Sequence, residues 1–296
     1  MKKLIIAARL NEYEMRAANP NVPWSAAELV RDAVACREAG ASIVHFHARD
    51  GVTGGPDHAT ETYAGILRGI HDACDVLIEP PLGTLNADPP ASRADQIAVL
   101  AADPRTRPDI AAIDMASVNL DLYDAARRVF RNDGLVFANP TDLLRAFTAT
   151  VRGAGVKTVH VCWNVGSLRL VEAFVDMGLV GAPAFLALRL SDGGLLAGHP
   201  PTPRGLQAYL DFLPCSGPVE WMAVASPGNI AHTAAMAIGL GGHIGVGLGD
   251  HSQPGLARRG EPPTNADVVR HFAALARSMG REVATPEEAR AILGMD

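Results

Sequence analysis

The fold is decided by Ser42-Ile43-Val44-His45-Phe46-His47, a short β-branched run that a segment of helical period follows near residues 59–73. This alternation predicts a βα unit of a parallel sheet. It recurs along the chain, and seven further strands are predicted at Lys3–Ala8, Val76–Glu79, Ile110–Met115, Thr158–Trp163, Ala184–Leu190, Glu220–Val224 and His243–Leu248. Eight strands in such units imply an α/β fold that closes into a (β/α)8, or TIM, barrel.

Each predicted strand has a helix after it, near residues 26–39, 59–73, 92–102, 120–131, 167–178, 204–212, 229–239 and 265–279. Two further helices are predicted, from Thr141 to Arg152 and from Thr285 to Leu293. Capping boxes at Ser25 and Thr285 support two of these helix starts. No composition break marks a second domain, so we expect a single barrel domain over residues 1–296.

Composition excludes several classes of function. The 296 residues are 48% hydrophobic and carry a formal charge of −6 with no Lys/Arg-rich run, so nucleic acid is not an expected partner. No stretch reaches the length of a membrane span, and the apolar part of the N-terminus is too short for a signal peptide, so we expect a cytoplasmic protein. The four scattered cysteines indicate neither a disulfide framework nor a thiolate zinc site.

The clearest chemical signal is the pair His45 and His47. Residues two apart on a strand point to the same face, so both imidazoles project together at the carboxyl end of the second strand, where barrel enzymes keep their active sites. Two neutral imidazoles can converge on one divalent metal ion. The alternative is a pair of histidines whose hydrogen bonds are satisfied in a packed barrel end.

Residues from other strand ends can join this pair. Strand eight of a closed barrel neighbours strand one, which neighbours strand two, so Asp250, His251 and Glu12 can share the same end as the histidines. Asp250 would be a candidate base, although a solvated aspartate in a Gly-rich loop is an equal alternative. Ser117 and Asn119 could hold a substrate carboxylate or carbonyl, or merely cap a helix.

Two arginines and one loop complete the predicted site. Arg9 and Arg49 could supply positive charge to an acidic substrate, and Arg49 could instead pair with its neighbour Asp50. The segment from Glu79 to Thr84 is expected to be rigid and to shape the end of the barrel, with little to donate to a ligand.

The chain resembles the β-keto acid cleavage enzymes, often named 3-keto-5-aminohexanoate cleavage proteins. The resemblance runs nearly end to end and rests on residues 19–23 (Asn-Pro-Asn-Val-Pro), 44–50 (Val-His-Phe-His-Ala-Arg-Asp), 115–119 (Met-Ala-Ser-Val-Asn), 241–250, 264–269 and 280–290. It implies a zinc-dependent barrel that condenses a β-keto acid with acetyl-CoA and releases acetoacetate and an acyl-CoA. By position it implies His45 and His47 as metal ligands, Asp250 as base, Ser117 as a lining hydroxyl, and Glu12 in preference to Glu14 as the substrate-contacting acid.

Three departures from the family pattern fall in this site. The position of an acidic zinc ligand is Gly249, the position of an arginine that acts with the base is Gly245, and a hydroxyl-bearing run is replaced by residues 81–84, Pro-Leu-Gly-Thr. His251, Glu12 or water could complete the metal site, and Arg9 or Arg49 could restore the charge.

Other functions stay open at this point. A metal-dependent hydrolase or aldolase could use the same residues without CoA, and the two glycines also suit a catalytically silent barrel that only binds ligand. The ligand types suit Zn²⁺, Ni, Co or Fe, with Zn²⁺ preferred through the resemblance. Exposed apolar helices on barrels often pack into homo-oligomers, so self-association is expected.

Overall fold

The computed structural model describes residues 2–12, 14–82, 89–258 and 260–295. At its centre lies a sheet of parallel strands in the order β3-β2-β1-β12-β11-β10-β9-β4. The strands are β1 (Ile6–Arg9), β2 (Ile43–His45), β3 (Leu77–Glu79), β4 (Ile110–Asp114), β9 (Lys157–Cys162), β10 (Ala184–Leu190), β11 (Val219–Ala225) and β12 (His243–Val246). All eight predicted strands are thus present, and the predicted TIM barrel is confirmed.

The two end strands of the sheet, β3 and β4, meet through one aspartate. The backbone N–H of Asp109 donates to the carbonyl oxygen of Ile78 at 3.0 Å, and the Asp109 carboxylate accepts from the N–H of Ile78 at 2.8 Å. These two bonds nearly close the barrel at the place where strand pairing ends.

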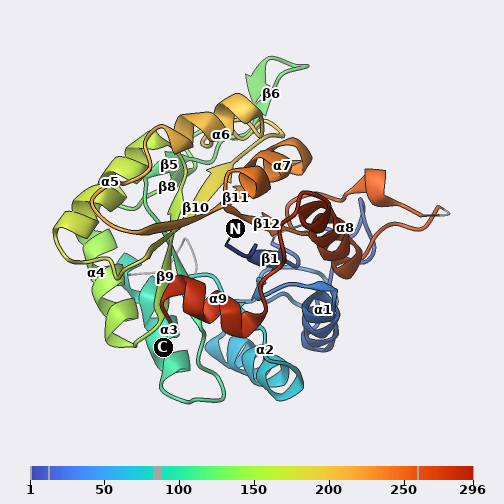
Figure 1. Cartoon of the computed structure of the whole chain (residues 1–296), viewed down its shortest axis with the longest axis horizontal. Helices are drawn as coiled ribbons and strands as arrows, with labels where there is room; N and C mark the ends of the chain where they lie inside the picture. The colour runs from blue at the N-terminus through green and yellow to red at the C-terminus, as the bar shows by residue number, and fades with distance from the viewer. Residues whose placement is uncertain (1, 13, 83–88, 259, 296) are drawn as a thin grey trace.

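Helices surround the barrel, as Figure 1 shows. They are α1 (Ala26–Ala39), α2 (Thr60–Ala73), η1 (Pro90–Ala94) with α3 (Asp95–Ala101), α4 (Thr141–Gly153), α5 (Val165–Asp176), α6 (Pro203–Leu210), α7 (Ala231–Gly239), α8 (Asn265–Ser278) and α9 (Pro286–Leu293). Capping boxes begin α1 and α9 at Ser25 and Thr285, as predicted. Helix α9 lies across the amino-terminal end of the strands, where Ala289 and Leu293 pack into the barrel interior. The opposite end, called the mouth below, is not covered by this helix.

One predicted helix is wrong. Residues 120–131 lie inside a segment of two short β-ladders, in which β5 (Val118–Asn119) pairs with β8 (Val136–Phe137) and β6 (Tyr123–Asp124) pairs with β7 (Val129–Phe130). Asp124 accepts bonds from the N–H groups of Ala126 and Arg127, so it makes a turn where a helix would need those groups. The helix that follows β4 is therefore α4, which confirms the helix predicted from Thr141 to Arg152.

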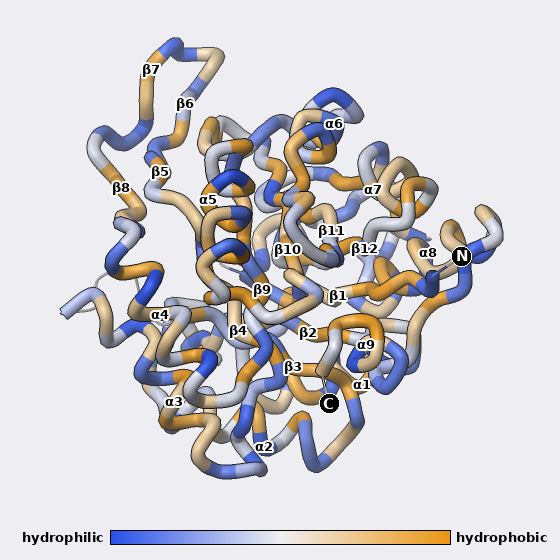
Figure 2. The backbone as a smooth tube through the Cα atoms, turned by 60° about the vertical axis from the view of Figure 1, so that its left-hand side comes forward, coloured by the Kyte–Doolittle hydropathy of each residue, from blue (hydrophilic) through white to orange (hydrophobic). Residues whose placement is uncertain are grey.

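Residues 118–137 form an arm that projects from the barrel, as Figure 2 shows. The backbone N–H of Tyr123 donates to the carbonyl of Gly194 at 2.9 Å, which ties the arm to the loop after β10. Across the described ranges, no helix is both long and apolar enough to cross a membrane.

Candidate active site

The inward faces of the strands change from apolar to charged as they reach the mouth. Alternate residues of each strand point into the barrel, where Ile5, Ala7, Ile43, Leu77, Ile110, Ala112, Phe185 and Ala187 form an apolar cluster. The next inward position on five of the strands carries Arg9, His45, Glu79, Asp114 and Arg189. This charged layer forms the floor of the mouth.

Glu12 is buried between the two predicted histidines. Its carboxylate oxygens lie 3.1 Å from Nε2 of His45 and 3.1 Å from Nε2 of His47. One ligand atom from each of these residues can be chosen so that all lie within 4.8 Å of one another. One carboxylate and two imidazoles at this spacing suit a divalent metal ion such as zinc.

The charge balance at this cluster also favours a cation. Burial lowers the pKa of His45, but the adjacent Glu12 carboxylate outweighs burial and raises it to about 9. Burial opposes ionisation of Glu12 as well, yet Arg9 and His45 hold the pKa of its carboxyl well below the usual value. Glu12 is therefore ionised, and its negative charge stabilises a positive charge on the groups beside it.

The loop that carries Glu12 is held by hydrogen bonds with the residues that follow β2. Glu12 has a φ of +38°, in the left-handed region that non-glycine residues seldom adopt, and such strain is often found at functional sites. Arg49 donates to the carbonyl of Glu12 at 2.7 Å, and Asn11 exchanges two bonds of 2.8 Å with the backbone of His47. These contacts hold Glu12 in register with the histidines.

Glu12 occupies the space that a side chain at position 249 would need. A Cβ atom built on Gly249 would lie 2.7 Å from the Glu12 nitrogen and 2.9 Å from its Cγ. Distances below 3 Å are not tolerated between these atoms without a shift of the backbone. The acidic residue that the family pattern expects at 249 is thus absent, and a carboxylate from the β1 loop lies in its place.

The side chains of Arg9 and Val224 lie against position 245. A Cβ on Gly245 would lie 3.1 Å from Cδ of Arg9, whose side chain covers the glycine. The Arg9 guanidinium pairs with Glu12, and its Nε lies 3.1 Å from the Asp250 carboxylate. Arg9 therefore connects the predicted base to the predicted metal cluster.

Asp250 is buried among charged groups, and its carboxyl takes up a proton at a higher pH than an exposed aspartate does. Burial raises the pKa of its carboxyl to about 6, and Arg9 offsets part of this effect. A carboxylate of this pKa is an effective base near neutral pH.

Glu79 is a residue that the sequence reasoning missed. The loop that begins at this residue was expected to donate little, yet the Glu79 carboxylate is buried and lies 3.3 Å from Nδ1 of His45. The Glu79 carbonyl is 2.9 Å from the same nitrogen. Contacts of this kind orient metal-binding histidines through the nitrogen that does not face the ion. The available signal was strand alternation, since Glu79 is the next inward residue after Leu77.

The other predicted site residues do not belong to the cluster of Glu12, His45 and His47. Ser117 and Asn119 are exposed, and the Ser117 hydroxyl accepts a bond from the Asn139 backbone at 2.8 Å. His251 accepts a bond from the N–H of Gln253 and is not among the grouped ligand atoms of the described chain. Arg49 donates to the backbone carbonyls of Glu12 and Glu14 and of Gly54. Of the predicted run from 81 to 84, residues Gly83 and Thr84 lie outside the described residues.

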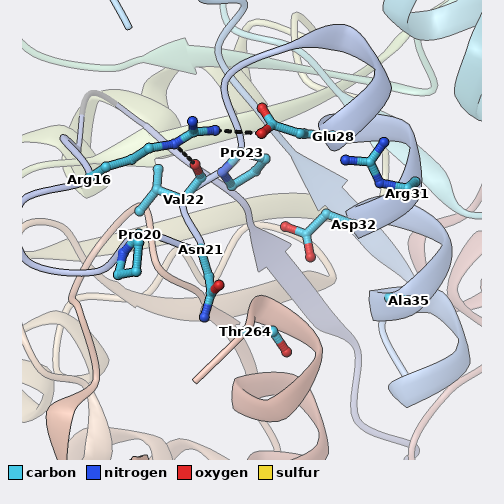
Figure 3. A pocket seen from close by; sticks show the side chains of 10 residues that line it. All are labelled: Arg16, Pro20, Asn21, Val22, Pro23, Glu28, Arg31, Asp32, Ala35 and Thr264. Atoms are coloured by element: carbon cyan, nitrogen blue, oxygen red, sulfur yellow. Dashed lines mark hydrogen bonds and ion pairs between the residues drawn. The ribbon is translucent and has the colours of Figure 1, made fainter. Parts of the chain in front are cut away.

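A hollow of about 360 Å³ lies between α1, the loop before it and the start of α8, as Figure 3 shows. Its lining combines both charge signs, and Arg16 is already bonded to Glu28 and to the carbonyl of Val22. Asp32 accepts a bond from Asn265 at 2.7 Å. Neither Asp250 nor any of Glu12, His45 and His47 lines this hollow, so it is separate from the site at the mouth.

The fold and the mouth together define a TIM-barrel enzyme with a buried carboxylate–imidazole cluster. The family model of the beta-keto acid cleavage enzymes matches residues 3–295, so the chain belongs to this family.

Relatives and solved structures agree with this assignment. The chain is 29% identical to a 3-keto-5-aminohexanoate cleavage enzyme of Acetoanaerobium sticklandii, over 100% of this chain and 99% of the relative. It is 26% identical to a 3-oxoadipate:acetyl-CoA acetyltransferase of Cupriavidus necator, over 99% of this chain and 94% of the relative. The apo structure of ObcA superposes with a TM-score of 0.73 at 16% identity, over 93% of this chain but 66% of ObcA, and supports the barrel fold.

Proposed function

We propose that the protein cleaves a β-keto acid in a metal-dependent reaction with acetyl-CoA, giving acetoacetate and the CoA ester of the remaining acyl chain. The names of the two relatives include a keto acid cleavage and an acetyl-CoA acyl transfer. The observation that carries the proposal is the buried group of Glu12, His45 and His47, connected through Arg9 to the Asp250 carboxylate.

In this proposal His45, His47 and Glu12 hold a divalent ion, and Zn²⁺ is the ion we expect from one carboxylate and two imidazoles. A bound ion would polarise the ketone and so acidify the carbon between ketone and carboxylate. Glu12 thereby takes the role of the acidic ligand that Gly249 cannot supply.

Asp250 is the proposed base. It takes a proton from the carbon between the two carbonyl groups, and the resulting carbanion attacks the acetyl carbon of acetyl-CoA and releases the CoA thiolate. The thiolate then attacks the original ketone carbon, and the bond between that carbon and its neighbour breaks. Asp250 returns the proton to the acetoacetate that leaves. Arg9 keeps Asp250 ionised and oriented, since it pairs with that carboxylate.

The remaining predicted residues have narrower roles. Arg49 acts on the site by holding the backbone of Glu12, and its contact with substrate stays a prediction. Ser117 and Asn119 stay proposed substrate contacts, which would require the ligand to reach the base of the arm. Self-association and a cytoplasmic location are likewise proposals, the first to be measured by sedimentation of the purified protein.

The test is elemental analysis and activity of the zinc-loaded protein. We expect about one equivalent of metal in the natural protein, and loss of metal in Glu12→Ala and in the double variant His45→Ala, His47→Ala. Glu14→Ala is the matched control, because this carboxylate belongs to the same loop but not to the cluster, and it should retain metal. Full metal content in Glu12→Ala would exclude Glu12 as a ligand and make His251 the next candidate.

Assays of keto acids with and without acetyl-CoA separate the competing functions. Turnover that requires acetyl-CoA supports the proposal, whereas turnover without it would indicate a hydrolase or aldolase. Metal binding with no turnover of any keto acid would indicate the ligand-binding barrel. Arg9 and Glu12 argue against a barrel that only binds ligand, because they supply at the mouth the charges that Gly245 and Gly249 lack.

A further inference from the structure

Arg189 is a charged residue of the mouth that the proposed chemistry does not use. It lies near the carboxyl end of β10, two residues after the inward-facing Ala187, so its side chain also points into the barrel. In the ring of strands, β10 is four positions from β2, which carries His45. Arg189 and the metal cluster therefore lie on opposite walls of the mouth.

Few protein groups engage the Arg189 guanidinium. It stacks over the ring of Trp163, 4.2 Å from the ring centroid, and one nitrogen donates to the Ser226 hydroxyl at 3.2 Å. Its buried Nε has no hydrogen-bond partner, and no carboxylate of the described chain lies within the 4.0 Å of an ion pair. Arg9, by contrast, is paired with two carboxylates. A guanidinium offers five donors, so most of those on Arg189 remain available.

The neighbours of Arg189 fix its orientation. Trp163 is itself held, because its Nε1 donates to the Asp114 carboxylate at 2.6 Å. Stacking on this ring sets the plane of the guanidinium before any ligand arrives, which lowers the entropic cost of binding. A planar fork of donors matches a carboxylate in a bidentate way.

We infer that Arg189 is a specificity-determining residue that binds a second carboxylate, at the acyl end of the keto acid. The inference rests on the proposed function, in which the reacting carbonyl lies at the His45 wall. A substrate bound there extends across the mouth, so its far end meets Arg189. The natural substrate is then a keto dicarboxylic acid, and a substrate with a neutral or cationic acyl end is disfavoured.

The first experiment compares two substrates that differ only at the far end. Values of kcat/KM are measured for 3-oxohexanedioate and for 3-oxohexanoate, which carries a methyl group in place of the second carboxylate. We expect a preference of roughly 100-fold for the dicarboxylate, which Arg189→Gln abolishes with little change for 3-oxohexanoate. Arg145→Gln, at an exposed arginine of α4, is the control and should keep the preference.

Three results would overturn the inference. The first is no preference of the natural protein for either acid. The second is an equal loss of kcat/KM for both acids in Arg189→Gln, which would assign Arg189 to the carboxylate that both share. The third is a rise in the KM of acetyl-CoA alone in that variant, which would assign Arg189 to a CoA phosphate.

A second experiment does not depend on turnover. Binding of glutarate, a dicarboxylate without a ketone, is compared by Trp fluorescence with binding of its monoamide, glutaramate. We expect glutarate to bind at least about tenfold more tightly and Arg189→Gln to remove the difference. If no keto acid is turned over, the proposed function fails while this comparison still decides the carboxylate site. Equal binding of glutarate and glutaramate would refute the site.

Discussion

At the scale of single residues, two charged side chains at the mouth come from other positions than the family pattern expects. Strand β12 and the loop after it present Gly245 and Gly249 where the family pattern expects an arginine and an acid, and β1 with its loop supplies both groups through Arg9 and Glu12. The pairing of Ala7 with Gly245 in neighbouring strands makes this exchange geometrically simple, since side chains from one strand overlie the bare backbone of the next.

Asp250 should give the reaction its pH dependence. Burial raises the pKa of Asp250 to about 6, and only the ionised form can take a proton. We expect kcat/KM to be flat above this pH and to fall tenfold per pH unit below it. Asp250→Asn should lower kcat by roughly 100-fold or more and leave metal content unchanged. An acidic limb that persists in the residual activity of Asp250→Asn would assign the limb to another group.

The sequence predicted that His45, His47 and Asp250 lie at one end of the barrel, but it did not predict the contacts between them. Strand alternation places His45 and His47 together and order along the chain brings Asp250 beside them, but neither shows which acid lies between the imidazoles. The resemblance implies Glu12 as the substrate-contacting acid, and Glu12 is also one of three candidates to complete the metal site. Its place between the imidazoles depends on a left-handed backbone conformation and on Arg49, which are properties of the folded loop. Glu79 and Arg189 were missed although the same alternation points them inward.

At the scale of elements, strands and capped helices were predictable, and the arm was not. The segment 120–131 carries residues that suit a helix, yet Asp124 bonds to nearby backbone N–H groups and Arg128 has a φ of +57°. Such local bonds compete with a helix, and periodicity does not reveal them.

Asn265, the first residue of α8, joins the strand ends that carry the site. It accepts from the N–H of Leu248 at 2.7 Å and donates to the carbonyl of Leu10 at 2.8 Å and to Asp32 at 2.7 Å. Asn265→Leu would leave these buried groups without partners, so we expect a loss of about 2–5 kcal/mol in the free energy of unfolding. Denaturant unfolding measures it, with Ser278→Ala on the same helix as a control expected to change little. A loss below about 1 kcal/mol would contradict this role.

At the scale of the whole molecule, one end of the barrel is covered by a helix and the other carries the candidate site. Helix α9 fills the amino-terminal end with Ala289 and Leu293, so ligands must enter at the carboxyl ends of the strands. The candidate metal ligands there come from β2, the residues after it and the loop after β1, so a bound ion would bridge separate parts of the barrel.

Zinc should therefore stabilise the entire fold. A ligand that binds only the native state at 100 times its Kd adds about 2.7 kcal/mol. For a chain of this size that is roughly 5 °C in Tm. We expect this rise on adding Zn²⁺ to metal-stripped protein, and none in the double variant His45→Ala, His47→Ala. Mg²⁺ should have little effect, because it prefers oxygen ligands. An equal rise in the double variant would locate the ion elsewhere.

The close approach of Glu12 to Gly249 also constrains how this chain can have diverged. A side chain at 249 and the present Glu12 cannot occupy the same volume, so the two arrangements exclude each other. Any mutational path between them must move the Asn11–Glu12 backbone, because a Cβ at 249 would lie 2.7 Å from the Glu12 nitrogen and 2.8 Å from the Asn11 carbonyl carbon. Positions 12 and 249 are therefore epistatic: transplanting an acid to 249 in this protein should be harmful by itself, and descendants should change the two sites together.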